Sequence, residues 1–107
     1  MPRPTELDPE LLRAAAGEAV VALKALGNPE RLLLLCQMSQ RESSVGELEE
    51  ALGIFQPTLS QQLGVLRREG MVETRREGKK VFYRVADERL LALLRTLYTL
   101  YCPKEAT

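Results

Sequence analysis

Two cysteines are the residues in this sequence that could take part in covalent chemistry. They are Cys36 and Cys102, 66 residues apart, and the chain contains no histidine. Without histidine there is no Ser-His or Cys-His pair to activate a nucleophile, and no imidazole to bind a metal. Two thiols alone make an incomplete zinc site. We therefore expect neither an enzyme nor a cofactor, and no metal site.

Each cysteine could also be a packing residue. Cys36 ends a leucine-rich run, where a buried free thiol behaves as a small apolar group. Cys102 stands just before Pro103, near the expected end of the last helix, and should be the more exposed. A cytosolic chain does not keep structural disulfides, so a functional pair would be redox-active. Inert cysteines and a redox pair remain alternatives at this point.

The composition is that of one soluble domain. The chain has 107 residues, of which 45% are apolar and 28% charged. An apolar run such as residues 32–36 is far too short to cross a bilayer. Acidic residues, and not an apolar segment, follow residues 1–4, so no signal peptide is expected. We expect a cytoplasmic protein with no membrane partner.

A zero net charge conceals one basic segment. Residues 56–84 carry seven Lys or Arg against three Asp or Glu, whereas residues 1–55 carry five against nine. A local basic segment on a neutral protein is a plausible contact surface for nucleic acid.

Start and stop signals predict the helices and strands around these residues. Asp8-Pro9-Glu10 and Asn28-Pro29-Glu30 each combine a cap, a proline and an acid, which predicts helices over residues 9–26 and 29–40. Residues 41–44 are expected to form a loop. Three more helices are predicted, over residues 47–52, 56–69 and 87–102. Alternating residues on both sides of Glu77-Gly78-Lys79 predict a β-hairpin with strands 71–76 and 80–85.

This order predicts a winged helix-turn-helix: mostly α with a β-hairpin wing, as four helices, two strands and a last helix. We expect a single domain over residues 1–107, divided into a flexible lead at 1–6, the helix-turn-helix at 47–69, the wing at 71–85 and a dimerisation helix at 87–102. The terminal helices carry more leucines than the core needs, so we expect a homodimer through them. The alternative is that they fold back on their own core.

The fourth predicted helix has the pattern of a recognition helix. Leu59, Leu63 and Leu66 share one arc and must face the core, so amides and hydroxyls lie on the outside. Glutamine pairs with adenine edges, hydroxyls contact bases or phosphates, and a basic hairpin tip contacts phosphates. The candidate DNA-binding residues are Gln56, Thr58, Ser60, Gln61, Gln62, Arg67, Arg68, Arg75, Arg76, Lys79 and Lys80. The expected partner is double-stranded DNA with a palindromic operator; the alternative is a winged-helix module for protein–protein contact.

Three segments resemble ArsR/SmtB-type repressors: ALGNPERL at residues 25–32, QPTLSQQL at 56–63 and RREGKK at 75–80. The resemblance implies a dimeric repressor that leaves its operator when an inducer binds or reacts. Metal-sensing members often carry Cys-Val-Cys where this chain has Ser44-Val45-Gly46, and others use Asp/His clusters on the last helix. A capping Ser is frequent where Phe55 stands, and Gln56 is a candidate to supply that cap.

One cysteine on the second helix and one on the last resemble the BigR/SqrR-like sulfur-responsive branch. The resemblance implies that persulfides or polysulfides link Cys36 and Cys102 through a disulfide or a sulfur bridge. DNA would then be released and sulfide-detoxification genes derepressed. Cys102 is expected to react first, with Lys104 two residues away, and Cys36 to resolve. The alternative is a repressor induced by a soft metal or a general thiol oxidant.

Overall fold

Capping side chains begin the first two helices where the sequence predicts. The computed structural model describes residues 8–102, so the predicted flexible lead lies outside the described residues. Helix α1 (Pro9–Leu26) follows Asp8, whose carboxylate accepts the N–H of Glu10 at 2.9 Å. Helix α2 (Pro29–Gln40) follows Asn28, whose side chain accepts the N–H of Arg31 at 3.0 Å. Both predicted ranges are confirmed.

The third helix starts two residues earlier than predicted because of a capping box. The hydroxyl of Ser44 accepts the N–H of Glu47 at 3.2 Å, and the Glu47 carboxylate accepts the N–H of Ser44 at 2.8 Å. These bonds, the Ser44 N–H first among them, lower the pKa of Glu47. Helix α3 (Val45–Leu52) ends at Gly53, whose φ of 67° is in the left-handed region that favours glycine.

The predicted loop at residues 41–44 is wrong in part, because strand β1 (Ser43–Ser44) lies within it. The sheet has the antiparallel order β1-β3-β2, with strand β2 (Val72–Glu77) and strand β3 (Lys80–Val85) forming the hairpin. Ser43 lies opposite Tyr83 of β3. A strand of two residues is too short to show alternation, and its partner is distant in sequence, so no local pattern predicts it.

The remaining two helices are confirmed with small shifts. Helix α4 (Thr58–Arg68) begins two residues later than predicted, because Gln56 lies outside it and its Oε1 accepts the N–H of Ser60 at 3.0 Å. The cap position itself is Pro57, and Gln56, one residue earlier, bonds one N–H of the first turn in the way the sequence suggested. Helix α5 (Glu88–Tyr101) is capped by Asp87 and ends at Cys102.

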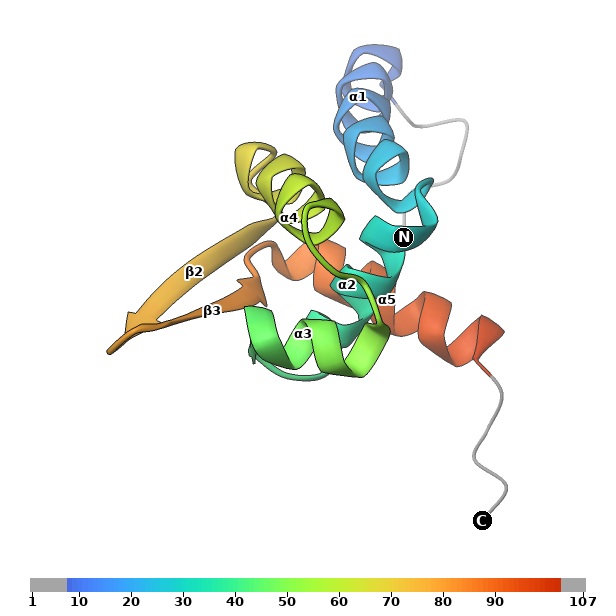
Figure 1. Ribbon diagram of the computed structural model, residues 1–107. Coiled ribbons are helices and arrows are strands. Elements are labelled where there is room, and N and C mark those ends of the chain that lie inside the picture. The colour runs from blue at the N-terminus through green and yellow to red at the C-terminus, as the bar shows by residue number, and fades with distance from the viewer. Residues whose placement is uncertain (1–7, 103–107) are drawn as a thin grey trace.

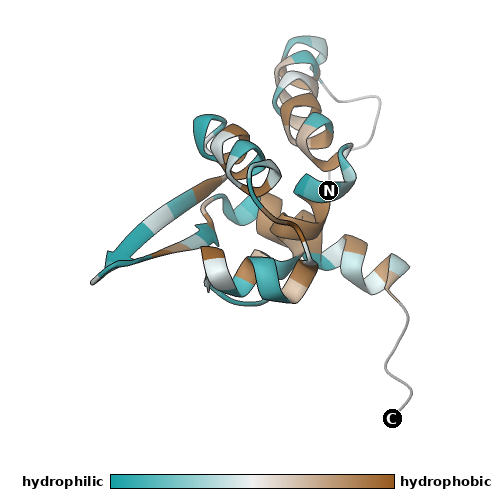
Figure 2. Cartoon of the chain, viewed as in Figure 1, coloured by the Kyte–Doolittle hydropathy of each residue, from teal (hydrophilic) through white to brown (hydrophobic). Residues whose placement is uncertain are grey.

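The core forms around α2, which packs against α1, α3, α4, α5 and β3. Apolar residues concentrate in α2 and in the part of α5 beside it, whereas the hairpin is mostly hydrophilic (Figure 2). The leucines buried to zero exposure come from four helices; they are Leu34, Leu35, Leu48, Leu59, Leu66 and Leu94. This core fixes α4 and the base of the hairpin relative to α2.

The parts that project from this core include α1, the β2–β3 hairpin and the last turns of α5 (Figure 1). Residues 9–21 of α1 are all exposed, and Ala25 is the one buried residue of that helix. The radius of gyration over Cα atoms is 16.0 Å, whereas a compact domain of this length has about 13 Å. Across the described part of the chain, no helix combines the length and apolarity needed to cross a membrane.

Candidate nucleic-acid interface and thiol pair

The outer face of α4 consists of exposed polar side chains. Leu59, Leu63 and Leu66 are buried as predicted, which turns Ser60 and Gln61 outward. The N–H groups of Leu59 and Ser60 are already bonded, to the Phe55 carbonyl at 2.9 Å and to Gln56. Contacts from this helix to a ligand must therefore come mainly from its side chains and less from the N–H groups of its first turn.

Gln62 does not share this outer face. It is half-buried on the side of α4 that meets α2, and its side chain hydrogen-bonds with Arg31 and Glu30. The structure therefore separates Gln62 from the exposed candidates Ser60 and Gln61. Thr58 is half-buried at the start of the helix.

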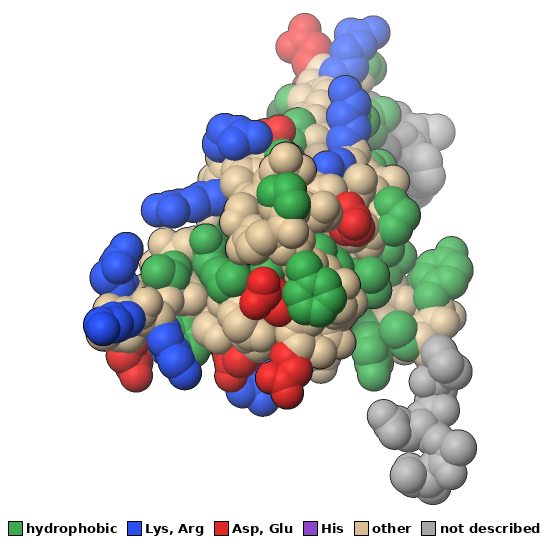
Figure 3. Space-filling view, viewed as in Figure 1, with side chains coloured by type: hydrophobic (Ala, Val, Ile, Leu, Met, Phe, Trp, Pro, Cys, Tyr) green, Lys and Arg blue, Asp and Glu red, His purple; other side chains and the backbone are tan. Residues whose placement is uncertain are grey.

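Basic side chains gather along the edge that carries the end of α4 and the hairpin tip (Figure 3). Arg67 and Arg68 are exposed in the last turn of α4. The hairpin adds three exposed cations, Arg76, Lys79 and Lys80. None of these five side chains forms a salt bridge with another described residue. Free cations of this kind are the residues that neutralise phosphates.

Arg75 differs from these five because its guanidinium is engaged within the protein. Its Nη2 lies 2.6 Å from Oε1 of Glu42, and its Nη1 bonds to Glu77. The guanidinium also lies over the Phe82 ring, 4.7 Å from the ring centre. The bond with Glu42 is the largest cause that raises the pKa of Arg75. Arg75 thus links the hairpin to the segment before β1.

Sequence reasoning missed the partners Arg31 and Glu42. Arg31 hydrogen-bonds to Gln62, which is 31 positions away, and Glu42 accepts from Arg75, which is 33 positions away. Helical and strand periodicity describe neighbours within a few positions, so neither contact has a local signal.

Cys36 lies on α2 and Cys102 directly follows α5, and these two helices pack against each other. Cys36 is half-buried beside the core, and Cys102 is exposed at the end of α5. Burial raises the pKa of the Cys36 thiol, and the charge of the Cys102 thiolate raises it further. Both cysteines are free thiols.

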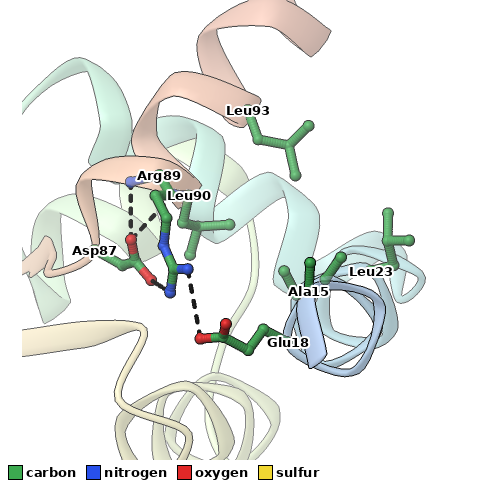
Figure 4. A pocket seen from close by; sticks show the side chains of 9 residues that line it. Ala15, Glu18, Leu23, Asp87, Arg89, Leu90 and Leu93 are labelled. Carbon is green, nitrogen blue, oxygen red and sulfur yellow. Dashed lines mark hydrogen bonds and ion pairs between the residues drawn. The ribbon is translucent and has the colours of Figure 1, made fainter. Parts of the chain in front are cut away.

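An apolar groove separates α1 from α5 (Figure 4). Its volume is about 370 Å³, and Ala15, Leu23, Leu90 and Leu93 contribute to its walls. At one end Arg89 bridges Asp87 and Glu18, at 3.4 and 3.5 Å. Apolar residues on both helices also remain uncovered outside the groove; they are Leu11, Leu12, Val20, Val21, Tyr98, Leu100 and Tyr101.

Comparisons with known proteins agree with this arrangement. Residues 28–74 match the family described as bacterial regulatory protein, arsR family. The biofilm growth-associated repressor of Agrobacterium fabrum is 53% identical, over 84% of this chain and 77% of that protein. The crystal structure of the transcriptional repressor BigR from Xylella fastidiosa has a TM-score of 0.82 and 48% identity, covering 92% of this chain and all of that one.

A solution structure from Mycobacterium bovis is similar as well. It is described as a homodimeric winged helix-turn-helix DNA-binding domain and a possible ArsR-family transcriptional regulator. Its TM-score is 0.72 at 31% identity, over 87% of this chain and 86% of that one. The first two relatives are named as repressors, and the family consists of regulatory proteins and not enzymes.

Proposed function

Because the chain belongs to the arsR family of bacterial regulatory proteins, we propose that it is a homodimeric repressor that binds a palindromic operator and releases it when Cys36 and Cys102 react. The observation that carries the DNA-binding part is the line of cations that pair with no other described residue, beside the exposed amide and hydroxyl face of α4. In this geometry α4 enters the major groove. The proposed contact residues are Thr58, Ser60, Gln61, Arg67, Arg68, Arg76, Lys79 and Lys80, with Gln56 supporting the start of the helix.

Uncovered apolar surface on α1 and α5 supports the dimer. Leu23 is 57% exposed in α1, and Tyr101 is 79% exposed in α5. Apolar patches of this kind usually mark an interface. A second copy of the chain would cover both helices and the groove between them. It would also present two α4 helices to two half-sites, which is why the operator is proposed to be palindromic.

The proposed switch begins at Cys102, because it is exposed while the pKa of Cys36 is raised. The Cys102 thiolate attacks the outer sulfur of a persulfide RSSH, which forms a Cys102 persulfide and releases RS⁻. The Cys36 thiolate then attacks the inner, Cys102 sulfur, which forms a disulfide and releases HS⁻. In sum, two thiols are oxidised, and the sulfane sulfur of RSSH is reduced to sulfide.

A longer bridge is possible in the same scheme. If the donor adds a second sulfur to Cys102 before Cys36 reacts, attack on the middle sulfur leaves a trisulfide and again releases HS⁻. A trisulfide spans a greater separation than a disulfide, which has Cα atoms usually 4.4–6.8 Å apart. Either bridge ties the end of α5 to α2, on which α4 packs. The cross-link would thereby re-angle the recognition helices.

The first test is DNA binding. We would select ligands from a random duplex library and measure affinity for the selected and random sequences at several salt concentrations. The expected result is one enriched palindrome and a steep loss of affinity as salt rises. Absence of binding to any duplex would contradict this function and favour the alternative, a winged-helix module for protein–protein contact. Binding without salt dependence would contradict the proposed phosphate contacts and favour the same alternative.

The second test separates the chemistries of the switch. Intact mass is measured after exposure to a persulfide donor, a disulfide or peroxide, with Cys102→Ala and Cys36→Ala as controls. Linked Cys36–Cys102 peptides that form with the persulfide donor alone support sulfur sensing. Loss of two hydrogens with every oxidant indicates a general thiol switch. The Cys102→Ala variant should bind DNA when reduced and keep it after polysulfide treatment; release by that variant would refute the sensor.

A further inference from the structure

One polar cluster connects three helices, and it includes a predicted DNA-reading residue. The Arg31 guanidinium donates to the carbonyls of Ala25 and Lys24, both at 3.2 Å, at the end of α1. The same guanidinium donates through Nη1 to Oε1 of Gln62 on α4, also at 3.2 Å. Arg31 itself belongs to α2, so this single side chain joins α1, α2 and α4.

Both the oxygen and the nitrogen of the Gln62 amide are engaged within this cluster. Its oxygen accepts from Arg31, and its Nε2 donates to Oε1 of Glu30 at 3.1 Å and more weakly to Asn28 at 3.4 Å. A glutamine that reads adenine needs both its carbonyl oxygen and its NH₂ group for the base. Gln61, one position along, is exposed on the outer face of α4.

We infer that Gln62 is a positioning residue, which with Arg31 and Glu30 holds α4 at a fixed angle to the α1–α2 junction. The inference rests on the proposed DNA binding and deepens it. Because α1 also belongs to the proposed dimer surface, this contact sets how far apart two recognition helices lie. A change in that spacing weakens binding to every operator variant alike, whereas loss of a base contact acts at one base pair.

A reversal of donor and acceptor tests the contact directly. Gln62→Glu keeps an acceptor for Arg31 but removes the NH₂ donor and places a carboxylate beside Glu30. The expected result is a loss of operator affinity of about tenfold or more, since the bond to Glu30 is lost and two carboxylates are placed in contact. Adding Glu30→Gln returns a donor from the α2 side. The double variant Glu30→Gln/Gln62→Glu is therefore expected to recover most of the affinity.

The matched control is Gln61→Glu, which introduces the same carboxylate one residue away on the outer face. Adding Glu30→Gln to that variant should recover nothing. Each protein is titrated with the selected operator and with its single-base-pair variants. Failure of Glu30→Gln to rescue Gln62→Glu would overturn the inference. A change in base preference at one operator position after Gln62→Glu would overturn it too, because that result is the signature of a base-reading residue.

Thermal unfolding tests without DNA whether residues 30 and 62 interact. It is measured for the wild-type protein, for Glu30→Gln, for Gln62→Glu and for the double variant. A favourable coupling between positions 30 and 62 is expected, since the two side chains share one hydrogen bond. Additive effects would overturn the inference even if DNA binds normally. A wild-type protein that binds no DNA would refute the proposed function and the positioning role, while the coupling would still show whether these residues act together.

Discussion

Two surfaces of this protein are exposed for opposite chemical reasons. The α4–hairpin surface, formed by α4 and the β2–β3 hairpin, carries amides, hydroxyls and cations. The α1–α5 surface, formed by the terminal helices, carries leucines, valines and tyrosines. Polar side chains are stable in water until a charged ligand arrives, whereas uncovered leucines favour burial at once. The contrast indicates a permanent partner for α1 and α5 and a reversible one for α4 and the hairpin.

The largest expected effect is the loss of the dimer when the α1–α5 surface is altered. Leu23→Glu places a charge in the apolar groove, and it acts twice in a two-fold dimer. Burial of a leucine contributes about 1.5–3 kcal/mol, so the dimer should weaken by about 100-fold or more. Sedimentation velocity measures the change. The matched control is Gln40→Glu, which adds the same charge at an exposed position of α2, outside both surfaces. A Leu23→Glu protein that remains dimeric would place the interface elsewhere.

The next effect concerns base reading on the α4–hairpin surface. Gln61→Ala should cost about 1–3 kcal/mol on the operator, or about 5- to 150-fold in affinity, with little change on random DNA. Fluorescence anisotropy with both duplexes measures the selectivity. Equal losses on operator and random DNA would remove Gln61 from the base-reading set and leave it as a phosphate contact.

A smaller effect distinguishes two adjacent arginines of the hairpin. Arg76→Ala should weaken operator and random DNA alike and reduce the salt dependence of binding by about one ion per protomer. Arg75→Ala should leave that salt dependence nearly unchanged, because Glu42 and Glu77 already neutralise its guanidinium. Salt titrations of the two variants make the comparison. An identical change in both slopes would show that Arg75 leaves its carboxylates when DNA binds.

The smallest effect concerns the pH at which Cys36 reacts. Burial and the Cys102 thiolate both raise the Cys36 pKa, so removal of the second charge by Cys102→Ser should lower that pKa. Burial is the larger cause, so most of the elevation should remain. Cys36 then becomes reactive at a slightly lower pH, which alkylation followed by mass spectrometry measures across a pH series. An upward shift, or none, would contradict the proximity of the two thiols.

Local signals predicted most of this fold because capping and periodicity act over a few residues. Asp8, Asn28 and Asp87 each begin a helix as expected, and the leucines of α4 are buried as their spacing requires. The errors at α3 and α4 are shifts of two residues. They arose where a capping side chain lies just outside the helix, as Ser44 and Gln56 do.

The candidate site was less evident from the sequence. The helical periodicity predicted that Gln62 flanks the outer face to which Gln61 belongs. In the structure Gln62 hydrogen-bonds to Arg31 of α2, whereas Gln61 is exposed. In the hairpin, residue type alone gave Arg75 and Arg76 the same role. Glu42 and Phe82 separate them, and both become neighbours of Arg75 through the pairing of β1, β3 and β2.

The sequence by itself determined where the helices and the two strands of the hairpin lie, since the free energy of a cap or of an apolar stripe depends on residues close in the chain. It also located the basic segment and the two thiols. It did not predict strand β1, because the pairing partner of that strand is distant in sequence. Only the tertiary structure decided which of these side chains are free to act. Gln62 and Arg75 have partners more than 30 positions away, and the packing of the elements leaves Cys36 half-buried and Cys102 exposed. Contacts of that kind depend on how separate elements pack, which local sequence does not encode.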